Sequence, residues 1–207
     1  AWISRNNIEL CHILQRCTRK NRGYAMSDKF YVSYNTVHKL IKGLAKKIEE
    51  EGFDPDVIVA IGSGGFIPAR IIKTFINRPI YAVGISYYGI DHKHRTHPTK
   101  IQWIDEVQEQ LRGKKVLLID EVDDTRATLA YCVGELLSYK PEEIAVLVLH
   151  NKKKKKDVEF PPEIKRYYPA LEIDDLWIKY PWDAEDIDEH TRKEKEMLEE
   201  LNGKKEN

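Results

Sequence analysis

The stretch Val116–Leu129, VLLIDEVDDTRATL, is the clearest indication of how this chain folds. An apolar run over 116–119 leads directly into two acidic pairs, and residues with helical spacing follow. An unbroken apolar run is typical of a strand that is buried on both faces of a parallel sheet. The stretch therefore predicts a strand, a loop and a helix within an α/β domain.

The same succession of strand and helix continues on both sides of this stretch. Apolar runs at 57–61, 79–88 and 144–149 predict further strands. Apolar residues that recur every three or four positions predict a helix from Ser33 to Gly52, and a second helix is expected from Pro68 to Ile76. Strands that alternate with helices imply an α/β fold with a mainly parallel sheet flanked by helices.

Three polar segments have a different interpretation. Residues 91–100 are rich in histidine and show no period, so a loop is expected there. The run of lysines at 152–156 is typical of a solvated, mobile loop. Residues 184–202 are charged with few apolar positions, and they predict a surface helix that frays.

The length of 207 residues fits one domain with small appendages. We expect this domain to span residues 26–190, after a basic N-terminal extension (1–25) and before a charged C-terminal tail (191–207). A basic, acid-poor leader is also the pattern of a transit peptide. The interpretation favoured here is an extension that is poorly ordered or not part of the working protein.

Composition limits the kinds of partner that this chain can have. The 34 basic and 34 acidic residues cancel, which argues against nucleic acid or an anionic membrane as partner, and no apolar run is long enough to span a bilayer. Three cysteines make no disulfide framework, so a reducing, cytoplasmic location is expected. The group Cys11, His12 and Cys17 does not have the spacing of a zinc site.

The acidic pairs of the first stretch are the best candidates for chemistry. Asp120 and Glu121 follow the apolar run, and ligands of open α/β sheets bind beyond the carboxyl ends of such strands. Two carboxylates there suit a magnesium-bound diol. The small and hydroxyl residues that follow open a helix, whose free N–H groups and dipole favour a phosphate. The phosphate candidates are Asp124, Thr125, Arg126, Ala127 and Thr128.

This arrangement resembles the diphosphate-sugar signature of the type I phosphoribosyltransferases. The resemblance implies that Asp120 and Glu121 hold ribose hydroxyls, partly through Mg²⁺, that the loop 124–128 holds the 5′-phosphate, and that Asp124 is the general base facing purine N7. The family often has glycine at the position of Arg126. An arginine there either adds charge beside the phosphate or points outward.

A glycine turn at 62–65 lies between an expected strand and an expected helix. Glycines allow the backbone to approach a ligand closely, and such turns bind phosphates through their N–H groups. The turn resembles the pyrophosphate-binding loop of the same family, which implies that Ser63, Gly64 and Gly65 bind the diphosphate. Because some relatives carry a charged residue at the position of Ser63, backbone donors would contribute more here.

The string WIKYPWD at 177–183 resembles the purine-binding segment of xanthine-guanine and fungal-type hypoxanthine-guanine phosphoribosyltransferases. The resemblance implies that Trp177 stacks on the base, that the main chain of Ile178 meets its 2-position edge, and that Asp183 lies near magnesium and pyrophosphate. The metal-binding candidates are then Asp120, Glu121 and Asp183. The alternative is that Trp177 and Trp182 only pack in the core or a lid.

A lysine at the end of the strand that begins near residue 144 is the candidate for base selection. The resemblance implies that Lys152 donates a hydrogen bond to the 6-oxo group of a purine, with Lys153 as the alternative. An ammonium group selects a 6-oxo over a 6-amino group, because two donors cannot pair.

The pair Ser86-Tyr87 resembles the start of the mobile hood of these enzymes, a small region over the site that excludes water. Lys93, Arg95 and Lys100 are unranked candidates for pyrophosphate contact. The histidines at 92, 94 and 97 are interpreted as part of a solvated lid rather than a metal site.

The resemblance, which covers about residues 31–190, implies a purine salvage phosphoribosyltransferase. Its substrates would be 5-phosphoribosyl-1-diphosphate and hypoxanthine, guanine or xanthine, its products the nucleotide and pyrophosphate, and its assembly a homodimer. The alternative is a non-catalytic regulator of the same fold that senses the diphosphate sugar. The neutral charge and the WIKYPWD segment argue against that alternative.

Overall fold

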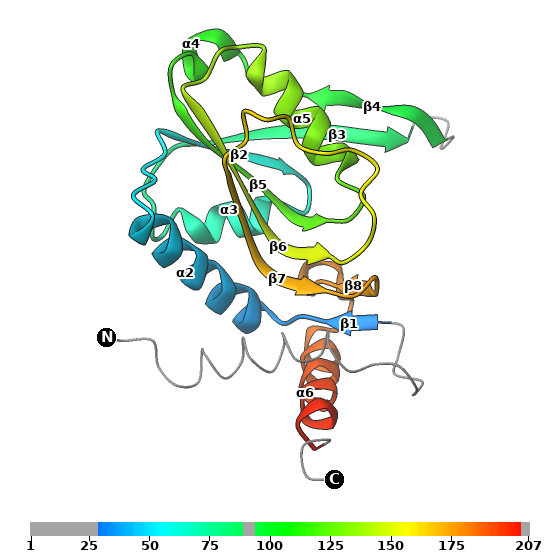
Figure 1. The fold of residues 1–207 in the computed structure, drawn as a ribbon. Helices are drawn as coiled ribbons and strands as arrows, with labels where there is room; N and C mark the ends of the chain where they lie inside the picture. The colour runs from blue at the N-terminus through cyan, green and yellow to red at the C-terminus, as the bar shows by residue number, and fades with distance from the viewer. Residues whose placement is uncertain (1–28, 89–93, 204–207) are drawn as a thin grey trace.

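The computed structural model describes the backbone of residues 29–88 and 94–203, with side chains omitted at 87–88, 94–97 and 202–203. Its main feature is a six-stranded sheet with the strand order β4-β3-β2-β5-β6-β7 (Figure 1). The strands are β2 (Val57–Gly62), β3 (Ile80–Tyr88), β4 (His94–Gln102), β5 (Lys115–Asp123), β6 (Glu143–Lys152) and β7 (Arg166–Ile173).

All neighbouring strands of this sheet are parallel except β3 and β4. The helices α2 (Tyr34–Glu50) and α3 (Phe66–Ile72) cover one face, and α5 (Ala127–Leu137) covers the other; the short helix α4 (Val107–Leu111) precedes β5 (Figure 1). The prediction of a mainly parallel sheet flanked by helices is confirmed. The expected helix from Ser33 is also confirmed, since the Ser33 side chain accepts a hydrogen bond from Thr36 N (3.2 Å) and caps α2.

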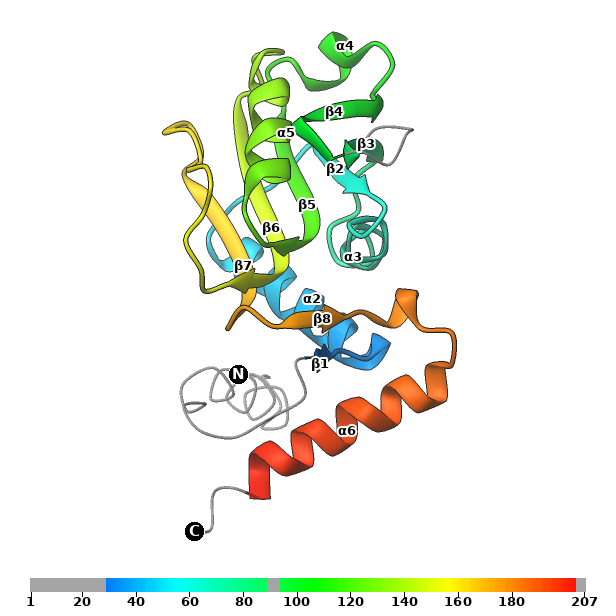
Figure 2. The ribbon, with the colours of Figure 1, turned by 90° about the vertical axis from the view of Figure 1, so that its right-hand side faces the viewer.

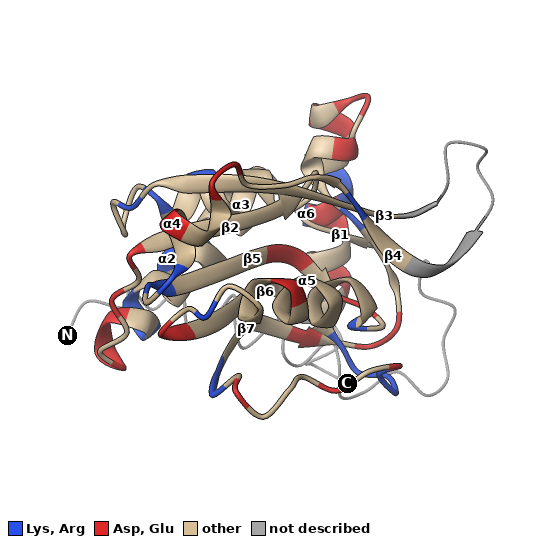
Figure 3. Cartoon of the chain, turned by 90° about the horizontal axis from the view of Figure 1, so that it is seen from above, with Lys and Arg blue, Asp and Glu red and all other residues tan. Residues whose placement is uncertain are grey.

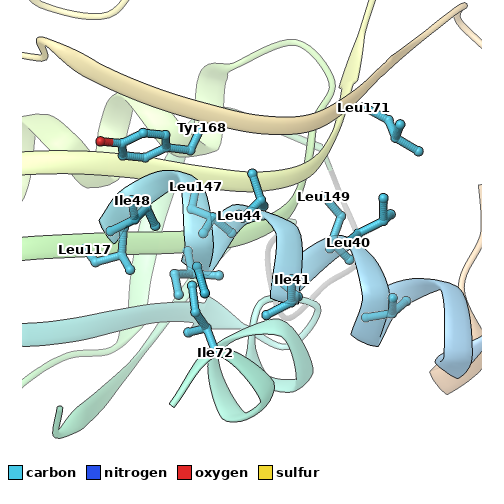
Figure 4. Packing of buried hydrophobic residues seen from close by; sticks show 14 of the residues in the cluster. Leu40, Ile41, Leu44, Ile48, Ile72, Leu117, Leu147, Leu149, Tyr168 and Leu171 are labelled. Atoms are coloured by element: carbon cyan, nitrogen blue, oxygen red, sulfur yellow. The ribbon is translucent and has the colours of Figure 1, made fainter. Parts of the chain in front are cut away.

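Alternate residues of the central strands enter two separate cores. Leu117 and Ile119 face α2 and α3, whereas Val116 and Leu118 face α5. On the first face, Leu40, Ile41, Leu44 and Ile48 of α2 pack against strand residues such as Leu147 (Figure 4). Burial on both faces explains why β5 is apolar without alternation.

The expectation of a loop at 91–100 is wrong for the residues that the structure describes, because 94–102 form the antiparallel edge strand β4. Its pairing with β3 supplies the order that its sequence does not predict. An edge strand can be polar and can contain a proline such as Pro98, since one of its sides faces solvent. The second predicted helix is also displaced: α3 begins at Phe66 and ends at Ile72 rather than Ile76.

The lysine run was interpreted as a solvated loop, and this is wrong for two of its members. Lys152 is the last residue of β6 and is buried, and the side chain of Lys156 is only 8% exposed. Lys153 and Lys155 are exposed, as expected. The reason for the difference lies in acceptors that are remote in sequence, described below.

A second, two-stranded sheet joins the two ends of the described chain. In it β1 (Lys29–Tyr31) pairs in parallel with β8 (Trp177–Lys179), which leads into the 3₁₀ helix η1 (Pro181–Asp183) and then α6 (Ile187–Gly203). Figure 2 shows α6 running alongside this small sheet. His190 Nε2 lies 2.9 Å from Val32 O, and Ser33 N donates to Glu194 Oε1 (2.8 Å).

The charged tail therefore contributes buried contacts as well as a solvated face, since His190, Glu194 and Met197 of α6 are buried. Within the described ranges, none of the helices is long and apolar enough to cross a membrane. The predicted extension 1–25 lies outside the described residues.

Candidate functional site

A cavity of about 270 Å³ lies at the carboxyl ends of β2 and β5. Of the residues predicted to bind the diphosphate sugar, all except Gly65 line it. The lining consists of Ile61, Gly62, Ser63, Gly64, Ile85, Asp120, Glu121, Val122, Asp124, Thr125, Arg126, Ala127, Thr128 and Leu129. In Figure 3, acidic residues colour the end of β5 where it approaches the start of α5.

The glycine turn closes one side of this cavity. Gly64 lies directly against the carboxylate of Glu121, because a Cβ built there would be 2.0 Å from Glu121 Oε2. Gly65 is buried beneath the turn, and a Cβ built there would be 2.6 Å from both Ile119 O and Ile61 O. Only glycine allows the turn to approach β5 this closely.

We expect Gly65→Ala to destabilise the fold by about 1–3 kcal/mol, the usual cost of forcing extra atoms into a packed interior. The matched control is Gly43→Ala on the exposed side of α2, where a Cβ meets nothing within 4 Å. That change should stabilise the protein by about 0.4–1 kcal/mol, because alanine restricts the unfolded chain. Urea unfolding of both variants measures the difference, and a neutral Gly65→Ala would contradict the packing described here.

Among the residues that the structure describes, no lysine or arginine forms an ion pair with the acidic pair at the end of β5. Asp120 is buried and accepts a hydrogen bond from Glu121 N (2.9 Å), and Glu121 Oε2 is buried with no hydrogen-bond partner. Burial, and then the charge of Glu121, raise the pKa of Asp120 well above its ordinary value. Two crowded, desolvated carboxylates with an unpaired oxygen form a site suited to a bound cation or a diol.

A buried chain of hydrogen bonds connects this pair to the segment around β8. Tyr180 Oη donates to Glu121 O (3.0 Å) and lies 2.9 Å from His150 Nδ1. Since the hydroxyl proton goes to the carbonyl, Nδ1 must carry the histidine proton and donate it to Tyr180. Burial lowers the pKa of His150 to about 3, so the ring is neutral. The hydrogen bonds therefore run in one direction, from His150 through Tyr180 to Glu121 O.

Asp124 lies in a cluster of alternating charges. Lys152 Nζ and Lys154 Nζ lie 3.4 and 2.8 Å from Asp124 Oδ1, and both lysines also pair with Asp175, at 3.2 and 3.1 Å. The side chain of Lys152 is 10% exposed, whereas those of Asp124 and Asp175 are about half exposed. The predicted base and the predicted 6-oxo ligand are thus adjacent.

Arg126 follows neither of the two orientations considered from the sequence. Its backbone has φ +70°, a conformation that suits glycine, and its guanidinium turns back to Asp123 Oδ2 (Nε 2.9 Å, Nη2 2.8 Å). It also lies 4.4 Å from the ring centroid of Phe160 and pairs with Glu159. The side chain is 12% exposed, and its guanidinium pairs with these partners, although the residue also contributes to the lining of the cavity.

Of the predicted purine-binding residues, Lys152 ends β6, whereas Trp177 and Ile178 lie on β8, and none of the three is in the lining of the cavity. Trp177 is 64% exposed, Ile178 is partly buried, and Trp182 stacks on Tyr180 at 4.6 Å. Asp183 follows Trp182 in η1. The stacking indicates that Trp182 packs, while the exposed face of Trp177 is available to a ligand.

The predicted hood lies at the end of β3 and in β4. Ser86 O accepts a hydrogen bond from Thr99 Oγ1 (3.3 Å) across the two strands, and Lys100 pairs with Glu135 of α5 (2.7 Å). The side chains of Tyr87, Arg95 and the histidines at 94 and 97, together with Lys93 and His92, lie outside the described part of the chain. Across the residues with described side chains, no three or more His, Cys, Asp or Glu side chains form a metal-binding group.

Residues 33–185 match the family described as the phosphoribosyl transferase domain. The chain belongs to this family. Xanthine phosphoribosyltransferase 1 of Saccharomyces cerevisiae is 43% identical, covering 81% of this chain and 95% of the yeast protein. Hypoxanthine-guanine phosphoribosyltransferase of Schizosaccharomyces pombe is 40% identical, covering 78% and 92%. A crystal structure of a hypothetical protein from Neisseria gonorrhoeae with bound ppGpp has a TM-score of 0.77 and 44% identity, covering 84% and 99%.

Four residues of this phosphoribosyltransferase have positions at the site that the sequence did not predict. Asp123 pairs with Arg126, and Lys156 donates to Asp124 O, so both contact the loop 124–128. His150 and Tyr180 connect the acidic pair to β8. Each lies close in space or in sequence to a residue that was predicted. The missing information was distance in space, because each contact except that of Asp123 with Arg126 joins positions at least 30 apart in sequence.

Proposed function

We propose that this phosphoribosyltransferase transfers the 5-phosphoribosyl group of 5-phosphoribosyl-1-diphosphate to hypoxanthine, guanine or xanthine in purine salvage. The products are the nucleoside monophosphate and pyrophosphate. The observation that carries the proposal is one cavity lined by the acidic pair, the glycine turn and the loop 124–128, with Lys152 paired to Asp124 at its edge. The names of the relatives in Saccharomyces cerevisiae and Schizosaccharomyces pombe specify xanthine, and hypoxanthine and guanine, as the purines they use.

The diphosphate sugar would bind along this cavity. Asp120 and Glu121 accept hydrogen bonds from the ribose hydroxyls, and the first turn of α5 binds the 5′-phosphate, since N–H groups of a first helical turn have no acceptor within the helix. Thr125 and Thr128 add hydroxyl donors. The backbone N–H groups of Ser63 and Gly64 would bind the leaving diphosphate. The sequence also predicted Gly65 as a ligand, but its N–H donates to Ile61 O (2.9 Å), so its role would be to let the turn pack closely.

Asp120 and Glu121 are the residues of the cavity that would hold Mg²⁺, and the resemblance adds Asp183 on η1. The buried Glu121 Oε2, which has no hydrogen-bond partner among the described residues, and the buried carboxylate of Asp120 beside it fit this role. Magnesium is normally held by one or two carboxylates together with substrate oxygens, so a protein site of three side chains is not required. When bound, the ion neutralises charge that develops on the leaving diphosphate.

The base would lie between β8 and the end of β6. Trp177 stacks on the purine, the main chain of Ile178 meets its 2-position edge, and Lys152 donates to the 6-oxo oxygen. Asp124 accepts the proton at N7. Catalysis then consists mainly of positioning and electrostatic stabilisation of a cation-like sugar, with Ser86 and Tyr87 starting the hood that excludes water.

We further propose that residues 26–190 form the working domain and that the protein acts as a homodimer in the cytoplasm. Light scattering of the purified chain tests the dimer, and deletion of residues 1–25 tests whether the extension is dispensable. The direct test of function is to incubate the protein with magnesium, the diphosphate sugar and each of adenine, hypoxanthine, guanine and xanthine. Nucleotide should form with 6-oxopurines; heat of sugar binding without product from any base would favour the non-catalytic regulator.

Removal of magnesium with EDTA should abolish turnover, with recovery when Mg²⁺ is added in excess. The expected loss is large because the carboxylates at 120 and 121 would otherwise face the negative diphosphate without a cation. Initial rates before and after chelation measure it. Undiminished activity in EDTA would remove the proposed metal role of Asp120, Glu121 and Asp183.

A further inference from the structure

The side chain of Lys156 is 8% exposed, less than those of its described neighbours Lys152 (10%) and Arg126 (12%). Its Nζ donates to three main-chain carbonyls, those of Asp123 (2.7 Å), Asp124 (2.9 Å) and Lys152 (3.0 Å). It also lies 3.4 Å from Asp123 Oδ1. One ammonium group therefore joins the loop after β5 to the end of β6, which are the two segments that carry the proposed base and the proposed 6-oxo ligand.

These contacts use every donor that the side chain has. An ammonium group has three N–H bonds, and three carbonyl oxygens accept them, so no donor remains for a phosphate or a base. Lys152 differs, because its contacts in the cluster are with the carboxylates of Asp124 and Asp175 at 3.2 to 3.4 Å. Lys156 is thus suited to fix backbone geometry and Lys152 to contact substrate.

The Asp123 side chain is a second point at which β5, the loop after it and the lysine run are joined. Its side chain is fully buried and accepts hydrogen bonds from Arg126 (2.8 and 2.9 Å) and Tyr167 Oη (2.8 Å), with Lys156 beside it. A buried carboxylate is retained at low cost only when cations and donors surround it. One further main-chain bond, Asp157 N to Thr125 O (3.0 Å), ties the end of the lysine run to the phosphate loop.

We propose that Lys156 and Asp123 are positioning residues that set the spacing between the Asp124 carboxylate and the Lys152 ammonium. This inference rests on the function proposed above. Neither residue touches substrate; each acts through the main chain of the residues that do. A shift of about 1 Å in reacting groups can reduce turnover roughly 100-fold, so loss of this support should appear in the chemical step.

The test compares Lys156→Met with Lys155→Met. The first removes the buried ammonium but keeps a similar volume, and the second removes an exposed lysine next to it. We expect Lys156→Met to lower kcat roughly 10- to 100-fold while KM for the diphosphate sugar changes less than about 3-fold. The reason is that the carbonyls that Lys156 contacts belong to Asp123, Asp124 and Lys152, and not to residues 125–128, the glycine turn or the acidic pair, which would bind the sugar. Lys155→Met should match the wild type.

Asp123→Asn provides a second route if Lys156→Met does not fold, since it keeps the shape and removes the charge. It should show the same fall in kcat, and the two changes together should cost less than the sum of their separate effects, as expected for one network. Thermal unfolding of each variant shows whether the protein is folded at the assay temperature. A purely structural role would lower the melting temperature and leave kcat at 25 °C unchanged.

The outcomes separate this inference from the proposed function. An active wild type with unchanged kcat in folded Lys156→Met or Asp123→Asn would overturn the positioning role. A KM for the diphosphate sugar that rises as much as kcat falls would overturn it as well, since Lys156 would then behave as a ligand. A wild type that forms no nucleotide from any purine would refute the proposed function and this inference with it.

Discussion

Replacement of Asp124 by asparagine should lower kcat by about 10²- to 10⁴-fold, the usual contribution of a general base. The amide keeps the shape of the side chain but cannot accept the N7 proton. Binding of the diphosphate sugar should change little, because Asp120, Glu121 and the glycine turn line the same cavity and remain intact. Steady-state rates and calorimetric titration with the diphosphate sugar measure the two effects separately.

Asp175→Asn is the matched control for this substitution. Asp175 pairs with the same two lysines as Asp124, at 3.2 and 3.1 Å, so its neutralisation disturbs the charge cluster without removing the proposed base. We expect its kcat to fall by less than about 10-fold, as for other partly exposed ion pairs. Equal losses in the two variants, or equal losses of turnover and sugar binding in Asp124→Asn, would show that Asp124 is not the base.

Replacement of Lys152 by methionine should lower kcat/KM for 6-oxopurines by about 10- to 150-fold, the equivalent of one hydrogen bond to a charged donor. Lys152 is the lysine to change because its side chain is 10% exposed and its Nζ lies 3.4 Å from the carboxylate of the proposed base. Adenine, which presents an amino group at position 6, should not suffer the same loss. Competition assays with hypoxanthine and adenine measure the discrimination.

Lys153→Met is the control, since Lys153 is the adjacent lysine and its side chain is exposed. Only its main-chain N–H has a described role, as a donor to Ile173 O (2.7 Å). That variant should behave like the wild type. If Lys153→Met lost activity toward hypoxanthine and Lys152→Met did not, the ligand of the 6-oxo group would be Lys153.

Most of the central sheet could be predicted from local pattern. The runs in β2, β5 and β6 are apolar on both faces because each strand lies between two helical layers, and this leaves a signal in every residue. Strand β4 leaves no such signal. Its order comes from pairing with β3 at the edge of the sheet, and exposed positions such as Ile101, at 73%, place little constraint on the sequence.

The site residues that are contiguous in sequence could be predicted, whereas those that contact one another only in the folded structure could not. The acidic pair and the loop 124–128 are contiguous, so their grouping follows from the sequence and the resemblance together. The orientation of Arg126 depends on Asp123 and Phe160, and the burial of Lys156 depends on carbonyls of β5 and β6. No periodicity reports which way a long cationic side chain turns once partners converge from several elements.

The pairing of β1 with β8 has a consequence for biosynthesis. Lys29–Tyr31 leave the ribosome well before their hydrogen-bonded neighbours, Trp177–Lys179, which are almost 150 positions later in the sequence. The nascent chain can build β2, β3 and β5 while the segment proposed to stack on the purine is still missing. Because contacts between remote segments form slowly, we expect nucleobase recognition to mature after the sugar-binding part of the site.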